Sequence, residues 1–442
     1  MLGILVYWLY LYDIVLLFKS KTIFESMGLG WGRVLKSYAR YQNIQCMTNE
    51  QNRKIKIIGE IYTPSYPIEI KELFSGRTEQ LRSVFDFLRQ KGKHIIVYGD
   101  RGVGKTSFAN VIKVICESNQ QVVKVSCSTE DSFEILFHNV LSKLTYDYEE
   151  AQKKIGFGSE IEKTNRSLIF SNLYSPDQLN IQVLTSVLGL INPIIIMDEF
   201  DRLNSEIFNK AIFTDLLKNL ADNLPNTTLI IVGVSEDVSS LIEQHLSIER
   251  NLSQIYMPSM SSNEIRAIIT KGERPIELIF DEEVKERIVN LSSGYPHFTH
   301  SLCYYSTTSA VLDSSSIVSN LHLNYAIKQT IENAHESLRN SYRTATLATK
   351  QNIYQEVLYA ASIVETDEYG YFQANDLEDI LSSLLSKKLK VNNFTFHLGK
   401  FCTEERGEIF IMTGAKNRHR YKFKNPLMRA FIRLKMEQKN LA

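Results

Sequence analysis

The sequence has few cysteines and prolines, and its charges cancel. Among 442 residues there are five cysteines and nine prolines, with 50 basic and 50 acidic side chains. The cysteine number is odd and no CxxC pair occurs, which excludes the spacing typical of zinc sites and argues against a disulfide framework. We therefore expect a reducing, cytoplasmic environment. Because the net charge is zero, only local clusters can indicate a charged partner such as nucleic acid.

The length and composition predict a chain of several domains. A hydrophobic content of 44% supports real cores, and no internal repeat or long low-complexity tract interrupts them. Chains of this length hold two or three domains. We divide it into an N-terminal arm (1–60), an α/β core (61–257), a helical region (258–345) and a C-terminal domain (346–442).

The N-terminal arm leaves three interpretations open. Residues Leu2 to Phe18 are apolar except for Asp13, and Lys19 and Lys21 follow. This run is at the short limit for a membrane-spanning helix, which needs about 20 apolar residues. It is a membrane anchor, a buried helix, or an extension that the cell does not make. The polar stretch that begins at Met47 resembles an ordinary start and favours the third interpretation.

The most informative segment is a glycine-rich loop between a strand and a helix. It fits the pattern G-x-x-x-x-G-K-[ST] at every fixed position and comprises Gly99, Asp100, Arg101, Gly102, Val103, Gly104, Lys105 and Thr106. An apolar run precedes it and a helix beginning at Ser107 follows, the context that phosphate binding requires. We expect this segment, Ser107 included, to bind ATP. Lys105 would reach the terminal phosphates, and the Thr106 hydroxyl would hold Mg²⁺.

Strands alternate with helices on both sides of this loop. Four apolar runs predict strands at 95–98, 121–127, 193–197 and 228–234, and helical spacing predicts helices at 107–117, 131–144, 175–190 and 207–223. Such alternation is typical of a parallel sheet covered by helices on both faces. The predicted fold is therefore an α/β phosphate-loop domain.

Two acids at the end of the third strand predict the hydrolytic centre. The run Ile194 to Met197 leads into Asp198 and Glu199. In phosphate-loop enzymes the first acid supports magnesium and the next polarises the attacking water as a general base. Asp201 suits two roles equally, a contact to the ligand or a cap of the following helix.

Two further side chains are weaker candidates. Ser235 ends the fourth strand, where it would act as a phosphate sensor or only cap a helix. Arg250 would reach the nucleotide of a neighbouring subunit as an arginine finger, or only pair with Glu249 or Glu243. The finger interpretation implies a homo-oligomer.

The C-terminal domain predicts a winged helix with a basic wing. Helices near 353–364, 374–387 and 391–401 precede short strands at 408–412 and 421–424, the layout of a helix-turn-helix variant. Five alternating cations share one face of the wing: Lys416, Arg418, Arg420, Lys422 and Lys424. That face suits phosphate contacts on duplex DNA, or docking on an acidic patch of the protein's own core.

Together these motifs resemble the AAA+ superfamily, and more closely the STAND signalling ATPases and the related Orc1/Cdc6-like ATPases. The markers are Phe74-Ser75-Gly76-Arg77-Thr78-Glu79, the phosphate loop, the acids from Asp198, and Gly294-Tyr295-Pro296. The resemblance implies a helical lid over the nucleotide at 258–345. It also implies that Arg77 and Pro296 lie beside the adenine and ribose.

One departure separates the sequence from replication-type relatives. Those proteins carry an arginine in the lid helix, where this chain has His297-Phe298-Thr299-His300. The missing arginine favours the signalling branch, although no repeat array follows that would sense a ligand. Two functions therefore stay open: a nucleotide-controlled signalling or assembly switch with a protein partner, and a DNA-acting ATPase of the replication-initiator or transposition-helper type.

Overall fold

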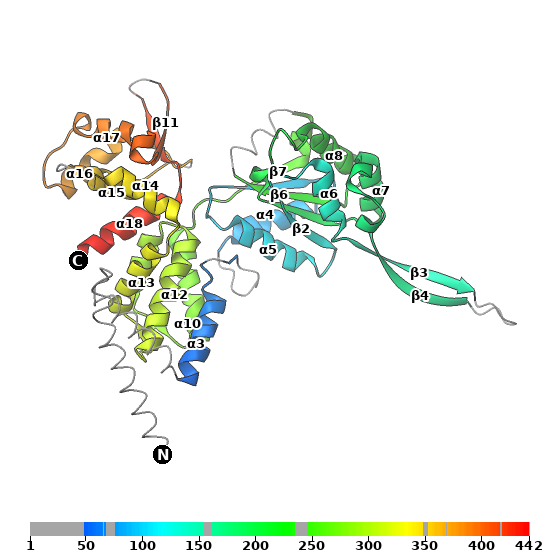
Figure 1. Ribbon diagram of the computed structural model, residues 1–442, viewed down its shortest axis with the longest axis horizontal. Helices are drawn as coiled ribbons and strands as arrows, with labels where there is room; N and C mark the ends of the chain where they lie inside the picture. The colour runs from blue at the N-terminus through cyan, green and yellow to red at the C-terminus, as the bar shows by residue number, and fades with distance from the viewer. Residues whose placement is uncertain are drawn as a thin grey trace, which may run out of the picture. The chain divides into compact units, whose positions relative to one another are not determined.

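The computed structural model describes residues 48–64, 66–67, 76–153, 161–234, 246–347, 352–367, 369–415 and 418–441 (Figure 1). The predictions for Leu2–Phe18, Ser235 and Lys416 lie outside these residues. The chain divides into two compact units, residues 1–57 and 58–442. The first described helix, α3 (Asn49–Ile61), crosses that division.

The second unit contains the predicted parallel sheet. Its order is β2-β5-β6-β1-β7, and every neighbouring pair is parallel. The strands are β1 (His94–Tyr98), β2 (Val122–Ser126), β5 (Ile194–Asp198), β6 (Thr228–Gly233) and β7 (Leu252–Tyr256). The strand β6 separates β1, which leads into the phosphate loop, from β5, which ends in the acids. Because these strands are parallel, the carboxyl ends of β1 and β5 lie at the same edge of the sheet.

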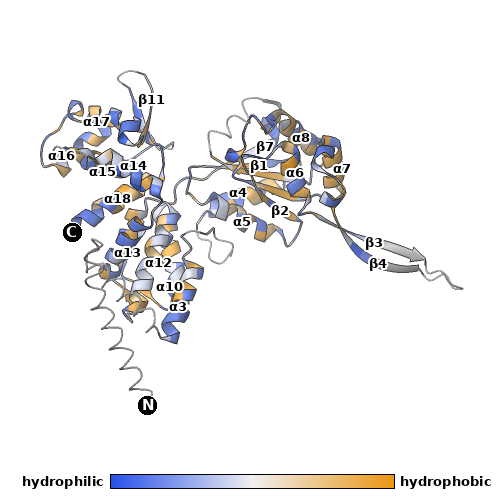
Figure 2. Ribbon diagram, in the orientation of Figure 1, coloured by the Kyte–Doolittle hydropathy of each residue, from blue (hydrophilic) through white to orange (hydrophobic). Residues whose placement is uncertain are grey.

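Helices cover both faces of this sheet, because its strands are apolar on both sides (Figure 2). On one face α6 (Phe133–Leu141), α7 (Ile181–Ile191) and α8 (Lys210–Asn223) form one core with alternate strand residues such as Ile195 and Met197. The other side is contacted by α4 (Thr78–Leu88) and α5 (Lys105–Cys116). The predicted α/β phosphate-loop fold is thereby confirmed.

Three local features differ from the sequence prediction. The strand β7 had not been expected, although Leu252 and Ile255 are buried in it. The polar stretch after α6 forms an antiparallel hairpin, β3 (Thr145–Lys153) and β4 (Ile161–Ile169), that extends from the core (Figure 1). The helix expected from Ser175 begins later, because Asn180 accepts the first amide hydrogen bonds of α7 and Ser175 starts only a 3-10 turn.

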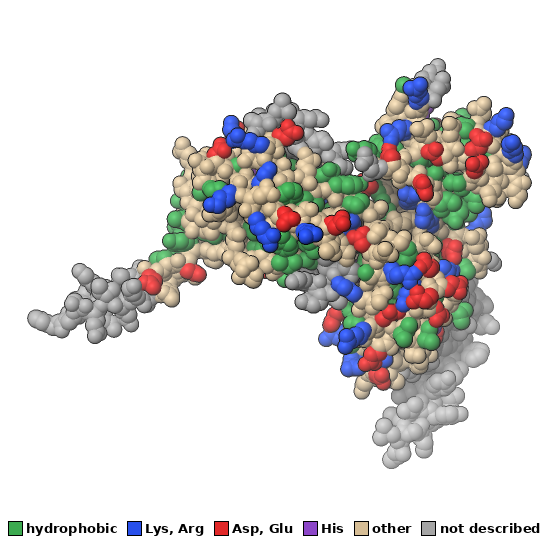
Figure 3. All heavy atoms as spheres, turned by 180° about the vertical axis from the view of Figure 1, so that it is seen from behind, with side chains coloured by type: hydrophobic (Ala, Val, Ile, Leu, Met, Phe, Trp, Pro, Cys, Tyr) green, Lys and Arg blue, Asp and Glu red, His purple; other side chains and the backbone are tan. Residues whose placement is uncertain are grey.

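A helical region follows the sheet. Its helices are α10 (Ser262–Ile276), α11 (Glu282–Ser292), α12 (Pro296–Leu312), α13 (Asn320–Glu332) and α14 (Glu336–Thr346). A short parallel pair, β8 (Ile279–Phe280) and β9 (Ile317–Val318), was not expected here. On the face in Figure 3, basic and acidic side chains are interspersed, in keeping with the balanced composition.

The C-terminal domain has the element order that a winged helix requires. The order is α15 (Tyr354–Ile363), β10 (Phe372–Gln373), α16 (Glu378–Leu384), α17 (Thr395–Lys400), β11 (Phe410–Thr413), β12 (Arg420–Phe423) and α18 (Leu427–Asn440). Its strands pair antiparallel in the order β10-β12-β11. Tyr421 and Phe423 of β12 are buried as expected, so the basic residues of that strand take the other face.

Among the described residues, no helix combines the length and the hydropathy needed to cross a membrane.

Candidate functional site

The phosphate loop joins β1 to α5 through backbone that only glycine adopts easily. Gly102 has φ +87° and Gly104 has φ +94°, both in the left-handed region. These turns precede Lys105, the first residue of α5, so the amide groups of the loop and of the helix N-terminus converge. A loop of this kind binds phosphate through backbone N–H groups.

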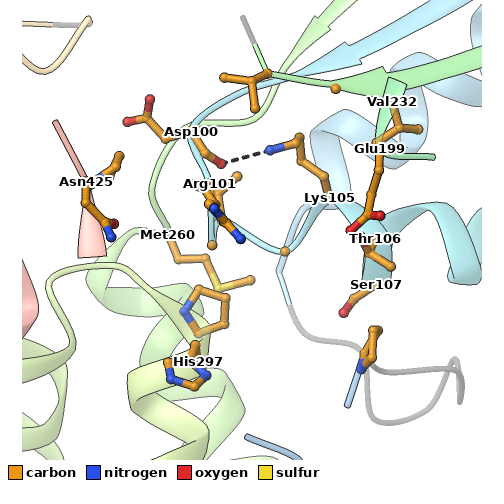
Figure 4. Close-up of a pocket in the computed structure, with 18 of the residues that line it drawn as sticks. Asp100, Arg101, Lys105, Thr106, Ser107, Glu199, Val232, Met260, His297 and Asn425 are labelled. Atoms are coloured by element: carbon orange, nitrogen blue, oxygen red, sulfur yellow. Dashed lines mark hydrogen bonds between the residues drawn. The ribbon is translucent and has the colours of Figure 1, made fainter. Parts of the chain in front are cut away.

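The Lys105 ammonium lies at the mouth of this loop. It donates a hydrogen bond to the carbonyl oxygen of Asp100 at 2.9 Å (Figure 4) and another to that of Gly99, also at 2.9 Å. Burial lowers the pKa of Lys105, and the carboxylates of Asp201, Asp100 and Asp198 oppose that shift. Within the described part of the chain, the cation donates to these two neutral carbonyl oxygens, and an anion in the loop would be a stronger partner.

Asp198 and Thr106 meet beside the loop, as the sequence predicted. Asp198 ends β5 and is 2% exposed. Its Oδ1 accepts from the Glu199 amide at 3.0 Å and lies 3.4 Å from the Thr106 hydroxyl. These two oxygens are ligands that Mg²⁺ prefers, and magnesium at phosphate sites takes its remaining ligands from water and phosphate. The donor set fits the ion, although no group of three or more metal-ligating His, Cys, Asp or Glu side chains occurs in the described part of the chain.

The structure adds Lys124, a residue that the sequence reasoning missed. Its ammonium lies 2.9 Å from Asp198 Oδ2 and 2.6 Å from Asn110 Oδ1. Lys124 is the one cation in the otherwise mainly apolar strand β2, which pairs with β5. A lone charge in such a strand was the sequence feature that could have indicated a partner for Asp198. The charge of Lys124 offsets the cost of burying Asp198 and lies beside the predicted metal position.

The predicted general base has a strained backbone and a partner. Glu199 has φ +56°, a conformation that is uncommon for a residue with a side chain. Its carboxylate is 2.8 Å from Arg202 Nη1, and both side chains are about half exposed. Asp201 lines the pocket that the phosphate loop borders, and it does not cap the following helix α8, whose N-cap is Asn209. The Asp201 Oδ1 accepts from the Val234 amide at 3.2 Å and thereby joins this turn to the end of β6.

Arg77 connects the phosphate loop to the start of the helical region. Its Nη2 donates to the carbonyl oxygens of Val103, at 3.1 Å, and Pro258, at 2.6 Å. Its own amide donates to Glu264 at 2.8 Å. The side chain is 2% exposed, and its Nε and Nη1 have no hydrogen-bond partner among the described atoms. Burial lowers the pKa of Arg77. The unused donors belong to a residue that lines the pocket.

Pro296 also lines this pocket, at the first position of α12. The next residue, His297, belongs to the stretch where replication-type relatives carry the lid arginine. Its Nδ1 lies 2.8 Å from the Pro64 carbonyl oxygen, and burial lowers its pKa. A neutral ring that donates to a backbone carbonyl is packed rather than poised to bind phosphate.

The C-terminal domain also lines the pocket, which the sequence did not reveal. The cavity measures about 1030 Å³, and residues 422–426 contribute to its wall, with Asn425 labelled in Figure 4. Lys422 Nζ lies 3.2 Å from Asp100 Oδ1. Leu427 packs on Gly102 so closely that a Cβ there would lie 2.7 Å from its Cδ2. The phosphate loop is therefore in direct contact with the C-terminal domain.

The other predicted DNA-contact residues have internal partners or none. Arg420 pairs with Asp367, and Lys424 Nζ lies 2.6 Å from Glu408 Oε2. Arg418 is exposed and forms no ion pair with a described residue. The predicted finger Arg250 is exposed as well, and it pairs with Asp222 at 3.7 Å rather than with Glu249, while Glu243 lies outside the described residues.

Comparison with known families identifies the family of this chain. The family model described as Novel STAND NTPase 1 matches residues 64–357, more than half of the chain. The chain belongs to this STAND NTPase family. The match includes the phosphate loop, the acids of β5 and the helical region. The predicted resemblance to STAND ATPases is confirmed.

Solved structures are similar to this STAND NTPase only remotely. The Aeropyrum pernix ORC2 protein is 12% identical (TM-score 0.44, covering 87% of this chain and 98% of that one). The Pyrobaculum aerophilum Cdc6p is 16% identical (TM-score 0.45, covering 86% of this chain and 98% of that one). A Walker-type ATPase of Pyrococcus abyssi is 16% identical (TM-score 0.47, covering 84% of this chain and 99% of that one). Curated proteins yield no match.

Proposed function

We propose that this STAND NTPase binds ATP with magnesium, hydrolyses it slowly, and uses the bound nucleotide to control the docking of its C-terminal domain. The observation that carries this proposal is the shared wall of the main pocket. The phosphate loop, the acids of β5 and residues 422–426 all line one cavity of about 1030 Å³. A ligand in that cavity contacts the catalytic residues and the C-terminal domain together.

The phosphates of ATP are bound by the loop amides and Lys105. Their negative charge draws the Lys105 ammonium away from the carbonyl oxygens of Gly99 and Asp100, because a charge-assisted hydrogen bond is stronger than a neutral one. Thr106 and Asp198 hold magnesium, which neutralises charge on the phosphates. Arg77 and Pro296 lie at the wall of the cavity on the lid side and are assigned to the adenine and ribose.

Glu199 is the general base that polarises the attacking water. Its carboxylate is bound to Arg202, so it must exchange this partner for water before each turnover. The ion pair lowers the population of the competent carboxylate, which accounts for slow hydrolysis. A slow rate suits a switch, because ATP then stays bound long enough for the docking of the C-terminal domain to respond to it.

Asp100 couples the nucleotide to the C-terminal domain. Its carbonyl oxygen accepts from Lys105, and its carboxylate pairs with Lys422. When Lys105 moves toward phosphate, Asp100 loses the hydrogen bond that its carbonyl oxygen accepts. The position of Asp100, and with it the ion pair to Lys422, then changes. We expect the affinities for nucleotide and for the docked domain to be linked, and linkage acts equally in both directions. The released domain then changes the assembly state or binds a protein partner.

A homo-oligomer would give Arg250 its proposed role. The side chain is exposed and only loosely paired with Asp222, so it is free to reach a neighbouring subunit. Arg250→Ala would then lower the ATP hydrolysis rate only at concentrations where the protein is oligomeric. An equal loss in the monomer contradicts a finger that acts between subunits.

A DNA-acting ATPase is the second candidate function. The exposed Arg418 and the basic face of β12 favour it. Against it, Arg420, Lys422 and Lys424 each pair with an acid of the same chain. The candidate recognition helix α17 has only six residues and no arginine. Any DNA binding would therefore depend mainly on phosphate contacts, with little sequence selectivity.

Two measurements on the full chain test these proposals. The first is the ATP hydrolysis rate in magnesium, with and without duplex DNA, at low and high salt. Slow turnover that ignores DNA supports the switch, whereas stimulation that fades with salt supports the DNA-acting function. The second is the particle size with ATP, with ADP and without nucleotide. An identical size in all three states contradicts the switch.

A further inference from the structure

A second, smaller cavity lies outside the nucleotide pocket. It measures about 270 Å³ and is formed by α10, α11 and the segment between α11 and α12 on one side, and by α18 on the other. Its polar lining residues are Ser261, Ser262, Asn290, Ser293, Arg429 and Arg433. No aspartate or glutamate lines it. The size admits a small anion rather than a nucleotide, since ligand pockets usually measure roughly 300–1,000 Å³.

Two arginines of α18 supply an uncompensated positive charge. Arg433 Nη1 donates to the Asn290 carbonyl oxygen at 2.8 Å, and its Nε and Nη2 donate to Ser362 at 3.0 and 2.6 Å. Arg429 donates to the carbonyl oxygens of Ser362 and Val364. Neither arginine forms an ion pair with a carboxylate in the described part of the chain. A guanidinium also has more N–H donors than these contacts use.

The proximity of the two cations is unfavourable without an anion. Burial lowers the pKa of Arg429. Burial also lowers the pKa of Arg433, to about 10, with a further contribution from the charge of Arg429. Helix-end carbonyl dipoles offset part of this repulsion, because Ser362 and Asn290 lie in the last turns of α15 and α11. An oxyanion in the cavity would offset the remaining repulsion between the two arginines.

An unpartnered hydroxyl group adds a third donor to the cavity. The Ser293 Oγ is buried and has no hydrogen-bond partner among the described atoms. Its residue has φ +51° and follows the last residue of α11. Buried hydroxyl groups almost always have a partner, so an orphan beside two arginines points to a ligand.

The N-terminus of α10 also favours a negatively charged ligand in the cavity. Ser261 is the N-cap of this 15-residue helix, whose N-terminal dipole is positive. Glu264, the acid of the first turn, accepts from the amides of Ser261 and Arg77 and does not line the cavity. The first turn thus adds no negative charge to the cavity wall.

We propose that this cavity binds a small tetrahedral oxyanion of the phosphate type through Arg429, Arg433 and Ser293. The site is separate from the nucleotide pocket, although Met260 borders both cavities. Its donors come from the helical region and from α18 of the C-terminal domain. The bound anion therefore ties these two regions together and stabilises their packing.

Inorganic phosphate tests this proposal in the full-length Lys105→Ala protein, whose phosphate loop is disabled. Phosphate should raise the melting temperature in a saturable way, and chloride at equal ionic strength should not. Ser293→Asp places a carboxylate in the cavity at a backbone conformation that aspartate tolerates. This variant should melt higher than its parent without phosphate and lose the phosphate response. An undiminished response in Ser293→Asp, or an equal shift with chloride, overturns the proposal.

A second variant separates binding from folding. Ser293→Gly removes the hydroxyl group at a positive φ that glycine adopts freely, so the fold should be retained. Phosphate affinity should fall roughly tenfold, the loss expected for one hydrogen bond to a charged group. The matched control is Ser314→Gly, another serine with positive φ, at 55°, which does not line the cavity. Equal phosphate affinity in the two glycine variants contradicts the role of Ser293.

Discussion

The phosphate loop and the basic strand β12 are both short sequence patterns, yet they relate differently to the folded structure. The glycines of the loop lie between β1 and α5 at the carboxyl edge of the sheet, and Lys105 and Thr106 begin α5, as the pattern requires. The cations of β12, Arg420 and Lys422, share one face, but both of them and the following Lys424 pair with acids of the same chain. One of these acids is Asp100, in the phosphate loop itself.

The difference reflects what each pattern specifies. The glycines fix a backbone conformation, because few other residues adopt φ near +90°. The alternation in β12 fixes only which side chains share a face. It does not specify whether the opposing negative charge belongs to DNA or to the protein. A motif that constrains the backbone therefore predicts a site more securely than a motif of charge.

The largest expected effect comes from breaking the loop. Lys105→Ala should weaken ATP binding by a factor of about 30 or more, since loss of a partly buried charge partner costs about 2–5 kcal/mol. Calorimetric titration measures the affinity. Lys113→Ala is the matched control, because Lys113 lies on the same helix but pairs with Glu117. A Lys105→Ala protein that binds ATP like the parent contradicts the phosphate assignment.

Removal of the base should separate turnover from binding. Glu199→Gln should lower the hydrolysis rate by about 10²–10⁴-fold and leave ATP affinity unchanged, because only the general base is lost. Single-turnover kinetics measures the chemical step. Glu206→Gln, an exposed residue of the neighbouring loop, is the control. Parent-like turnover in Glu199→Gln would show that another group activates the water.

Acid should destabilise both the sheet that carries the loop and the helical region. Two buried histidines, His94 in β1 and His300 in α12, have their pKa values lowered to about 4 by burial. The unfolded chain takes up these protons near pH 6.5 and the folded chain only near 4, so stability falls as pH drops between these values. Each histidine contributes at most about 3 kcal/mol. Urea unfolding at several pH values measures the loss, and a flat profile from pH 6.5 to 4 contradicts it.

The smallest effect tests the contact between the two regions. Lys422→Gln and Asp100→Asn should each loosen the C-terminal domain by about 1 kcal/mol, because the pair is partly exposed. Nucleotide should then exchange faster, which stopped-flow fluorescence measures with a labelled ADP. The double variant should add nothing beyond either single one. Lys424→Gln breaks a pair within the C-terminal domain and should leave exchange unchanged.

Much of the fold followed from the sequence, because local signals agree with tertiary structure in the α/β core. The apolar run before Gly99 and the run ending at Asp198 form β1 and β5, which end at the same edge of one sheet with β6 between them. The strand β7 was missed because its Ser253 and Gln254 interrupt the apolar pattern, and its pairing with β1 is set by distant residues. The hairpin β3–β4 was missed because polar strands carry no hydrophobic alternation.

By itself, the sequence determined the phosphate loop, the acids at the end of β5 and the parallel sheet. Each depends on backbone conformation or hydrophobic burial, which neighbouring residues specify. Only the tertiary structure decided which charges meet. Lys124 reaches Asp198 from another strand, Lys422 reaches Asp100 across 322 positions, and Arg429 and Arg433 line a cavity without a carboxylate. Coulombic partners are chosen by distance in space, and residue spacing along the chain does not encode that distance.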